Sequence, residues 1–558
     1  MFKRLRIIVR ATFYILSEDR LRYWLTMRWR RPIPVAVLTV FLCATHFGFA
    51  NPRQNHATER DQKILQIQQL IQDHDLEEAS REILEAAKQY PSDAGFDNLL
   101  GIVEAQQGNY TAAEKSFHQA VKREPKFTGA SLNLGRLYQE NSAVDSNARR
   151  KALEVYSGVL AYDPKNAEAN YQSAALLLQQ GKYGDSLEHI SRLPEESQSD
   201  AQVLSILCGD YAGLGVSGRT EDAAARLLSG PNFSVPDAQQ ALLGLRAGKR
   251  DDLVISLLES LQKRQQLPLE LLRALGLAYE GTGRLGEARA ALEKSIAPES
   301  LKVGSLLELA RVARKQQDYQ GSLGYLAHAR DLEPNNASIH YYFGLVCMDL
   351  NLVAEARNSF EKAVHIEPEN PEYNYAMGAT STFRHDPGEA VPYFEKYLRL
   401  KPQDPRGKLA LGAALFRAKD YDAAIPRLKE AAMIPEIATT AHYYLGAIAL
   451  QDRRLDEAHI ELEQALKSKP DYADALAELG QYYLVERNYS QAEKQLRRAL
   501  EIDADHYSAN FYLLTLYTRT GDARQEAQSK RFDDLKKLLA EKTQEFLRIV
   551  EVRPLETP

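Results

Sequence analysis

Apolar and polar positions follow one another along this chain at the spacing of amphipathic helices. Between residues 337 and 366 the apolar positions predict two helices with a turn at Asn351-Leu352 between them. The first helix carries Tyr341, Phe343, Gly344 and Cys347, and the second carries Ala356, Phe360 and Ala363. Small residues at Gly344 and Ala356 let the two helices approach closely, and Phe360 is expected to fill the space between one helix pair and the next.

The helix pair recurs with a fixed period of 34 residues. Glycines keep this spacing at Gly344, Gly378, Gly412, Gly446 and Gly480. Each is followed 12 residues later by an alanine, and Pro368, Pro402 and Pro470 keep the same period. A fixed period of this length indicates one supersecondary unit copied along the chain. The sequence therefore predicts an all-α solenoid with no central core.

The 34-residue frame extends over most of the chain. Units begin near residues 60, 94, 128, 167, 201, 235, 269, 303, 337, 371, 405, 439, 473 and 507, which makes about fourteen repeats, with one five-residue insertion within 141–150. We divide the chain into an N-terminal basic segment (1–50), a linker (51–59), N-terminal repeats (60–200), degenerate repeats (201–268), C-terminal repeats (269–522), and a capping helix with a tail (523–558).

Two segments depart from the repeat pattern. In the degenerate repeats Cys208 and Leu242 replace the glycine, and four glycines between 209 and 218 are expected to crowd one turn. This composition predicts a flexible point that divides the array into two lobes. In the last segment the apolar residues Phe532, Leu535, Leu539 and Phe546 form one stripe among charged residues, which is typical of a terminal cap.

The registered positions resemble those of the tetratricopeptide repeat (TPR) family, over roughly residues 60–545. An apolar residue followed by glycine occurs at 100–101, 134–135, 275–276, 343–344, 377–378, 411–412, 445–446 and 479–480, and the terminal proline occurs at 91, 125, 164, 334, 368, 402 and 470. The resemblance implies a right-handed superhelical solenoid. It also implies that the first helix of each repeat lines a concave groove that binds protein or peptide partners.

The family's groove positions supply candidate binding residues. They are Tyr341, Tyr375, Phe416, Tyr443 and Met348, together with the cationic Arg311, Arg314 and Arg417. Aromatic anchors with basic residues between them suit an extended peptide or a helix that carries carboxylates. The tyrosines also have a second interpretation, as wedges between adjacent helices. The lysine–asparagine set with which some family members grip a C-terminal carboxylate is not present at these positions.

No pattern in the chain indicates catalysis, a cofactor or a metal. The GxGxxG matches at 213–218 and 281–286 each follow a helix, whereas a dinucleotide site needs a preceding strand, so both are interpreted as turns between helices. The histidines form no metal-binding spacing. The first 50 residues hold nine Lys/Arg and two acidic residues, which leaves 61 basic and 74 acidic residues, a net charge of −13, in the rest. An acidic body argues against nucleic-acid binding.

The N-terminus has the layout of an export signal. Basic residues from Met27 precede the apolar run 35–50, and Gly48 and Ala50 are small residues suited to cleavage after Ala50. We expect Met27 to be the start and the body to be periplasmic or secreted. In the alternative, the run stays as an uncleaved inner-membrane anchor with the body still facing the periplasm.

The leading expectation is therefore a non-enzymatic, exported bacterial-type scaffold for protein–protein interaction. A second possibility is a component of an envelope secretion or polysaccharide-export assembly, because proteins of that kind resemble this one in joining a signal to many repeats. The hypothesis that the protein is an enzyme is the least favoured, since the repeat frame leaves no room for a catalytic domain.

Overall fold

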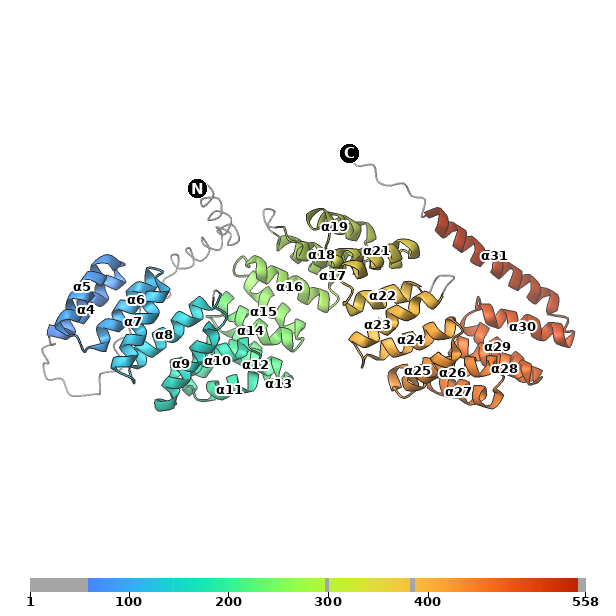
Figure 1. The fold of residues 1–558 in the computed structure, drawn as a ribbon, viewed down its shortest axis with the longest axis horizontal. Helices are drawn as coiled ribbons and strands as arrows, with labels where there is room; N and C mark the ends of the chain where they lie inside the picture. Colours follow the sequence, from blue (N-terminus) through green and yellow to red (C-terminus); the bar gives the residue numbers. More distant parts are fainter. Residues whose placement is uncertain (1–58, 144, 297–300, 382–386, 550–558) are drawn as a thin grey trace, which may run out of the picture. The chain divides into compact units, whose positions relative to one another are not determined.

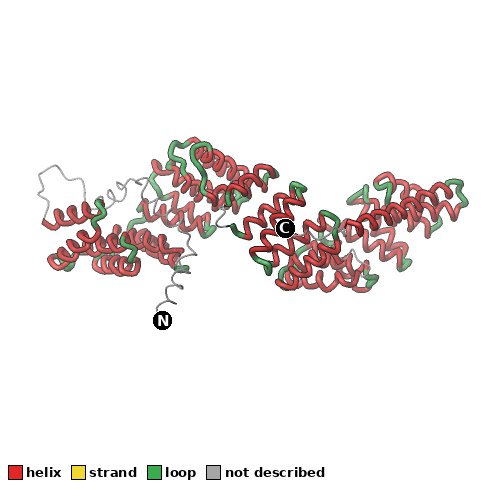
Figure 2. The backbone as a smooth tube through the Cα atoms, turned by 90° about the horizontal axis from the view of Figure 1, so that it is seen from above, coloured by secondary structure: helices red, strands yellow, loops and turns green. Residues whose placement is uncertain are grey.

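The computed structural model describes residues 59–143, 145–296, 301–381 and 387–549. In these residues 28 α-helices follow one another as antiparallel helix-turn-helix pairs (Figure 1). Their only regular structure is helical, as Figure 2 shows by colour. The predicted all-α array of about fourteen repeats is confirmed. The predicted basic segment and signal sequence lie outside the described residues.

The chain divides into two compact units, with the boundary between Leu267 and Pro268. The first helices of the repeats in the N-terminal unit are α4 (Glu59–Gln72), α6 (Ala94–Gln106), α8 (Thr128–Glu140), α10 (Ala167–Gln179), α12 (Ala201–Gly213) and α14 (Val235–Ala247). The second helices are α5 (Leu76–Gln89), α7 (Tyr110–Arg123), α9 (Ala148–Tyr162), α11 (Tyr183–Ser191), α13 (Ser217–Ser229) and α15 (Asp251–Gln262). Two short 3₁₀ helices, η1 (Asn141–Ala143) and η2 (Glu195–Ser199), occupy connections, and η1 lies in the insertion.

The C-terminal unit continues the same alternation. Its first helices are α16 (Leu269–Gly281), α18 (Val303–Lys315), α20 (Ala337–Asp349), α22 (Pro371–Ser381), α24 (Pro405–Arg417), α26 (Pro435–Gln451), α28 (Ala473–Val485) and α30 (Tyr507–Thr520). Its second helices are α17 (Leu285–Lys294), α19 (Tyr319–Leu332), α21 (Val353–Ile366), α23 (Val391–Leu400), α25 (Tyr421–Ala432), α27 (Leu455–Ser468), α29 (Tyr489–Ile502) and α31 (Gln525–Ile549). The 3₁₀ helix η4 (Pro387–Ala390) precedes α23.

First helices begin at the residue that opens each unit of the predicted frame, with two exceptions. Helix α4 begins one residue early, at Glu59, and α26 begins one turn early, at Pro435. A proline is well suited to the first turn of a helix, because its missing N–H would have no partner inside the helix at that position. Pro435 therefore allows α26 to extend backward.

In twelve of the repeats, the turn between the two helices contains one residue with a left-handed backbone. Positive φ recurs at the same position of the repeat frame, in His74, Gly108, Gly181, Gly215, Lys249, Gly283, Gln317, Asn351, Lys419, Arg453, Arg487 and Gly521. Gly215 and Gly283 are the middle glycines of the two GxGxxG matches, and each lies between the helices of one repeat. The interpretation of these matches as helix–helix turns is confirmed.

The recurring glycine makes room for a large side chain of its own repeat. A Cβ atom on Gly344 would lie 2.6 Å from ring atom Cδ1 of Phe360, and one on Gly412 would lie 2.6 Å from Cδ2 of Leu428. Real side chains do not pack at such distances, so only glycine allows this contact. Phe360 also packs with Met377 of the next repeat, so it joins repeats as predicted and covers its own glycine as well.

The degenerate repeats use other glycines, at a crossing between repeats. A Cβ atom on Gly244 of α14 would lie 2.6 Å from Cα of Gly209 in α12 and would overlap the Gly209 carbonyl oxygen. A Cβ on Gly248 would overlap the backbone of Ala212 in the same way. The first helices of these two repeats are therefore in backbone contact. Gly209 and Gly213 lie inside α12, which corrects the predicted crowding of glycines in one turn.

The last helix, α31, packs on α30. The Phe532 ring lies 5.1 Å from the Tyr507 ring and 5.7 Å from the Phe511 ring, and Leu535 is buried beside it. Leu539 is 41% exposed, and the side chain of Phe546 lies outside the described residues. In the described part of the chain, no helix is both long enough and apolar enough to cross a membrane.

Candidate protein-binding surface

The eight candidate binding residues all lie on first helices of the C-terminal unit. Arg311 and Arg314 are on α18, Tyr341 and Met348 on α20, Tyr375 on α22, Phe416 and Arg417 on α24, and Tyr443 on α26. The 34-residue period brings them to related positions of successive repeats. The apolar members are half-buried, so each presents part of its surface and uses the rest for packing.

Tyr341 packs between two repeats. Its ring centroid lies 5.8 Å from that of Phe360 in its own repeat and 5.0 Å from that of Tyr373 in the next. Burial raises the pKa of the Tyr341 hydroxyl, and the charge of Glu372 adds to this effect. Met348 belongs to the same apolar cluster. At α20 the candidate residues therefore serve as a wedge between repeats.

Tyr375 combines packing with a charged neighbour. Its ring lies 5.5 Å from Phe394 and 5.1 Å from Tyr397, and the Arg406 guanidinium stands 5.3 Å from its ring centroid. A guanidinium over an aromatic ring is a stabilising arrangement worth about 0.5–1 kcal/mol where water has access. Arg406 thus covers one face of the candidate anchor Tyr375.

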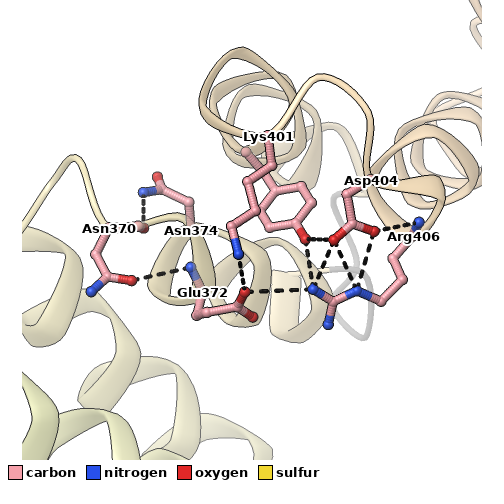
Figure 3. Close-up of polar contacts among 7 residues, drawn as sticks. Asn370, Glu372, Asn374, Lys401, Asp404 and Arg406 are labelled. Atoms are coloured by element: carbon pink, nitrogen blue, oxygen red, sulfur yellow. Dashed lines mark hydrogen bonds and ion pairs between the residues drawn. The ribbon is translucent and has the colours of Figure 1, made fainter. Parts of the chain in front are cut away.

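Figure 3 shows the polar network that holds Arg406 in this place. Its Nη2 donates hydrogen bonds to Asp404 at 2.9 Å and to the Tyr397 hydroxyl at 2.8 Å, and it lies 3.5 Å from Glu372 of the preceding repeat. Lys401 also contacts Glu372, at 3.1 Å. The hydrogen bonds from Arg406 lower the pKa of Asp404 to about 2, against the opposing effect of burial. The network connects α22 to α24, and its Asp404 carboxyl is ionised at neutral pH.

A continuous run of aromatic contacts follows from α24 onward. Ring centroids lie 5.1 Å apart for Phe416 and Tyr444, 5.0 Å for Tyr444 and Tyr443, and 5.3 Å for Tyr443 and Tyr472. Tyr472 is the N-cap of α28, so the run crosses from α24 over α26 to α28. Burial, followed by the charges of Glu478 and Asp474, raises the pKa of Tyr443. The family's groove positions predict Phe416 and Tyr443, but they do not include Tyr444, which lies between these two rings, or Tyr472, which lies beyond them.

The arginines of the candidate set make contacts inside the array. Arg311 donates hydrogen bonds of 2.8 and 2.6 Å to Glu280 on α16, and Lys315 lies 2.8 Å from the same carboxylate. Burial acts to raise the pKa of Glu280, but the hydrogen bonds from Arg311 and Lys315 outweigh it, and the net shift is downward. Arg314 donates to Asp349 on α20 at 3.0 Å. Two of the three predicted carboxylate-binding arginines therefore link first helices of adjacent repeats.

A sequence signal for these ion pairs exists. Glu280 precedes Arg311 by 31 residues, and Asp349 follows Arg314 by 35, so each carboxylate lies about one period from its arginine. Arg417 differs, because it is exposed and its side chain is hydrogen bonded to the Tyr444 hydroxyl. Of the predicted cations, Arg417 is the one that stands beside the aromatic run.

Metal-binding groups and surface depressions are the remaining features by which a ligand could bind. Among the described residues, no group of three or more His, Cys, Asp and Glu side chains is arranged to hold a metal ion. His442 contacts Glu461 of its own repeat at 2.6 Å. Two shallow depressions, of about 520 and 440 Å³, lie elsewhere, near Tyr90 and near Pro470, and none of the eight candidate residues lines them. The surface can offer rings and charges to a partner.

The fold and this surface define an α-solenoid of helix-turn-helix repeats. Three sequence models described as "Tetratricopeptide repeat" match the chain, at residues 143–207 and 449–522, at 65–125, 99–148, 307–371 and 383–436, and at 270–297. Together they cover well over half of it. The chain belongs to the tetratricopeptide repeat family, whose members typically act as non-enzymatic scaffolds for protein interaction. No curated protein sequence matches it.

Solved structures of related fold include a tetratricopeptide repeat protein from Parabacteroides merdae, with 16% identity, 45% of this chain and 98% of that chain covered, and a TM-score of 0.37. YrrB, described as a TPR protein with an unusual peptide-binding site, is 24% identical, and the match covers 33% of this chain and 95% of YrrB with a TM-score of 0.27. PilF of Pseudomonas aeruginosa is 20% identical, and the match covers 36% of this chain and 91% of PilF with a TM-score of 0.30.

Proposed function

We propose that this protein is a non-enzymatic extracytoplasmic scaffold that binds an extended segment of a protein partner along the first helices of its C-terminal unit. The observation that carries the proposal is the run of ring contacts from Phe416 through Tyr444 and Tyr443 to Tyr472. Partly exposed aromatic rings on successive repeats give a partner contact area at little cost in side-chain entropy. Tyr375 with Arg406 extends this surface toward α22.

The test must separate binding from support of the fold, because the same rings pack between repeats. The full chain carrying Tyr375→Ala and Tyr443→Ala should lose partner capture in affinity purification from the cell envelope. The same positions changed to Phe keep the rings and should retain capture. Tyr110→Ala, at a half-buried tyrosine of the N-terminal unit, is the matched control. Circular dichroism and thermal unfolding of each variant show whether the array is intact, and capture by the Ala variants at the wild-type level would contradict the proposal.

The extracytoplasmic location is supported by the N-terminal sequence. The basic residues after Met27, the apolar run and the small residues Gly48 and Ala50 are arranged as in a cleavable signal. Mass spectrometry of the natural protein should then find Asn51 at the N-terminus. A natural chain that begins at Met1 or Phe2 would contradict cleavage, and protease accessibility in spheroplasts would then test the anchored, periplasm-facing alternative.

A place in an envelope secretion or polysaccharide-export assembly is the second candidate. It is favoured by the combination of an export signal with an array of about fourteen repeats. If it holds, the partner captured through Tyr375 and Tyr443 is an envelope protein, and loss of this chain changes surface polysaccharide or secreted protein. A strain that lacks the chain and keeps both unchanged would exclude it.

A further inference from the structure

Glu308 and Glu478 occupy the same position of their repeats, five periods apart. Glu308 on α18 accepts a 2.8 Å hydrogen bond from the guanidinium of Arg273, which lies on the preceding first helix, α16. For Glu478 on α28, the corresponding residue of the preceding first helix is Tyr443. The cation that neutralises Glu308 is thus replaced by an aromatic ring at Glu478.

Three other carboxylates on first helices of this unit have lysine or arginine partners within the array. Glu280 is paired with Arg311 and Lys315, Asp349 with Arg314, and Glu372 with Lys401 and Arg406. Among the residues that the structure describes, no lysine or arginine lies within ion-pair distance of Glu478. Glu478 therefore lacks the kind of partner that balances Glu280, Asp349 and Glu372.

The surroundings of Glu478 are suited to a cation. Glu478 is partly buried, its charge acts on the hydroxyls of Tyr443 and Tyr512, and the Tyr512 hydroxyl is in hydrogen-bonding reach of its carboxylate. Burial raises the pKa of Glu478 to about 7, and the charge of Asp474 adds to this, while His506 opposes it. His506 is itself bonded to Asp474, at 3.1 Å. Removing a carboxylate from water without a cation is unfavourable, and aromatic rings attract cations at their faces.

We propose that Glu478 receives a lysine or arginine side chain of the partner segment, with the ring of Tyr443 beside the cation. The proposal rests on the proposed binding surface and specifies the chemistry that this surface recognises at α28. The proposal also reverses the charge expected of the partner. The candidate arginines predict a partner that carries carboxylates, but Arg311 and Arg314 are already paired with carboxylates within the array. The partner is then defined by a basic side chain next to apolar residues.

The test uses the full chain and two fluorescein-labelled extended peptides. Both carry the same apolar residues, and one has lysines where the other has glutamines. We expect wild type to prefer the lysine peptide by about tenfold in Kd, which corresponds to about 1.4 kcal/mol. Glu478→Gln should abolish the preference and leave the affinity for the glutamine peptide unchanged. Glu395→Gln, at an exposed carboxylate of α23, makes the same charge change and should keep the preference.

The outcomes separate this proposal from the one on which it rests. If both peptides bind and Glu478→Gln retains the wild-type preference, Glu478 does not receive the cation and its carboxyl serves only the fold. If Tyr443→Phe binds the lysine peptide and Tyr443→Ala binds neither peptide, the aromatic surface is supported independently of the charge. If wild type binds neither peptide, both proposals are overturned.

Discussion

Gly209 and Gly244 bring α12 and α14 into backbone contact: a Cβ atom on Gly244 would lie 2.6 Å from the Gly209 Cα atom. At the glycines that recur every 34 residues, the close approach is made within a repeat, between the glycine and a side chain of the second helix, as for Gly344 and Phe360. A side chain can move aside, but a backbone cannot. The crossing in the degenerate repeats is therefore the less tolerant of the two arrangements.

Gly244→Ala should destabilise the N-terminal unit by about 3 kcal/mol or more, because overpacking against backbone cannot be relieved by a rotamer change. Urea unfolding of the full chain, with hydrogen exchange of α12 and α14, measures the effect. The control is Gly158→Ala in the interior of α9, where an added Cβ meets no atom within 4 Å. That change should stabilise by about 0.5–1 kcal/mol, since alanine is the better helix former. Equal effects at the two sites would refute the backbone contact.

Asp210 should make the N-terminal unit less stable as the pH rises. The residue is fully buried, both carboxylate oxygens lack hydrogen bonds, and the neighbouring Ser186 hydroxyl donates instead to the Ala174 carbonyl. Burial raises the pKa of Asp210 to about 7. Between an unfolded pKa of about 4 and the folded value, the native state binds the extra proton, so stability falls as the pH rises through this window and is level above it.

Asp210→Asn removes this titration while keeping the shape of the side chain. We expect the variant to be more stable than wild type at pH 8, by as much as about 4 kcal/mol, and close to wild type near pH 5. Thermal or urea unfolding across the pH range gives the comparison. Parallel curves for the two proteins would mean that Asp210 does not carry a raised pKa in the folded state.

Arg311 and Arg417 should differ in what their removal affects. Arg311→Ala leaves the buried Glu280 carboxylate with Lys315 alone, and we expect a loss of about 1–3 kcal/mol, seen as faster hydrogen exchange in α16 and α18. Arg417→Ala, at an exposed site, should change stability by less than about 0.5 kcal/mol. Combining Arg311→Ala with Glu280→Gln should restore part of the loss. If Arg417→Ala lowers the stability and Arg311→Ala does not, then Arg311 is not the arginine that supports the fold.

Binding of the lysine peptide should strengthen as the pH rises through about 7. Below that pH the Glu478 carboxyl is protonated in the free protein and attracts a cation weakly, and His506, whose pKa is raised by its bond to Asp474, still carries charge nearby. Deprotonation of both groups makes the site more negative, so Kd should fall several-fold between about pH 6 and pH 8. Fluorescence anisotropy measures it. A Glu478→Gln variant with the same pH dependence as wild type would assign the effect to His506 alone.

The candidate surface was predictable in part. Tyr341, Tyr375, Phe416 and Tyr443 follow from the period together with the family's groove positions, and the structure places them on successive first helices. How much of each ring is covered by neighbouring side chains, and how much stays exposed, was not predictable. Tyr341 is held between Phe360 and Tyr373, while Tyr443 joins the run that includes Tyr444 and Tyr472, because neighbours in the next repeat decide how far each ring is covered.

The sequence by itself determined the helix pairs, their number and the places where they begin, since a 34-residue period and the residues that start and end helices are local properties of the chain. Only the tertiary structure decided which charges are balanced and where backbones touch. The pairing of Arg311 with Glu280, the crossing at Gly209 and Gly244, and the absence of such a partner at Glu478 among the described residues all depend on how each first helix is rotated against the next. That rotation is set by packing between repeats, which the order of residues within one repeat does not specify.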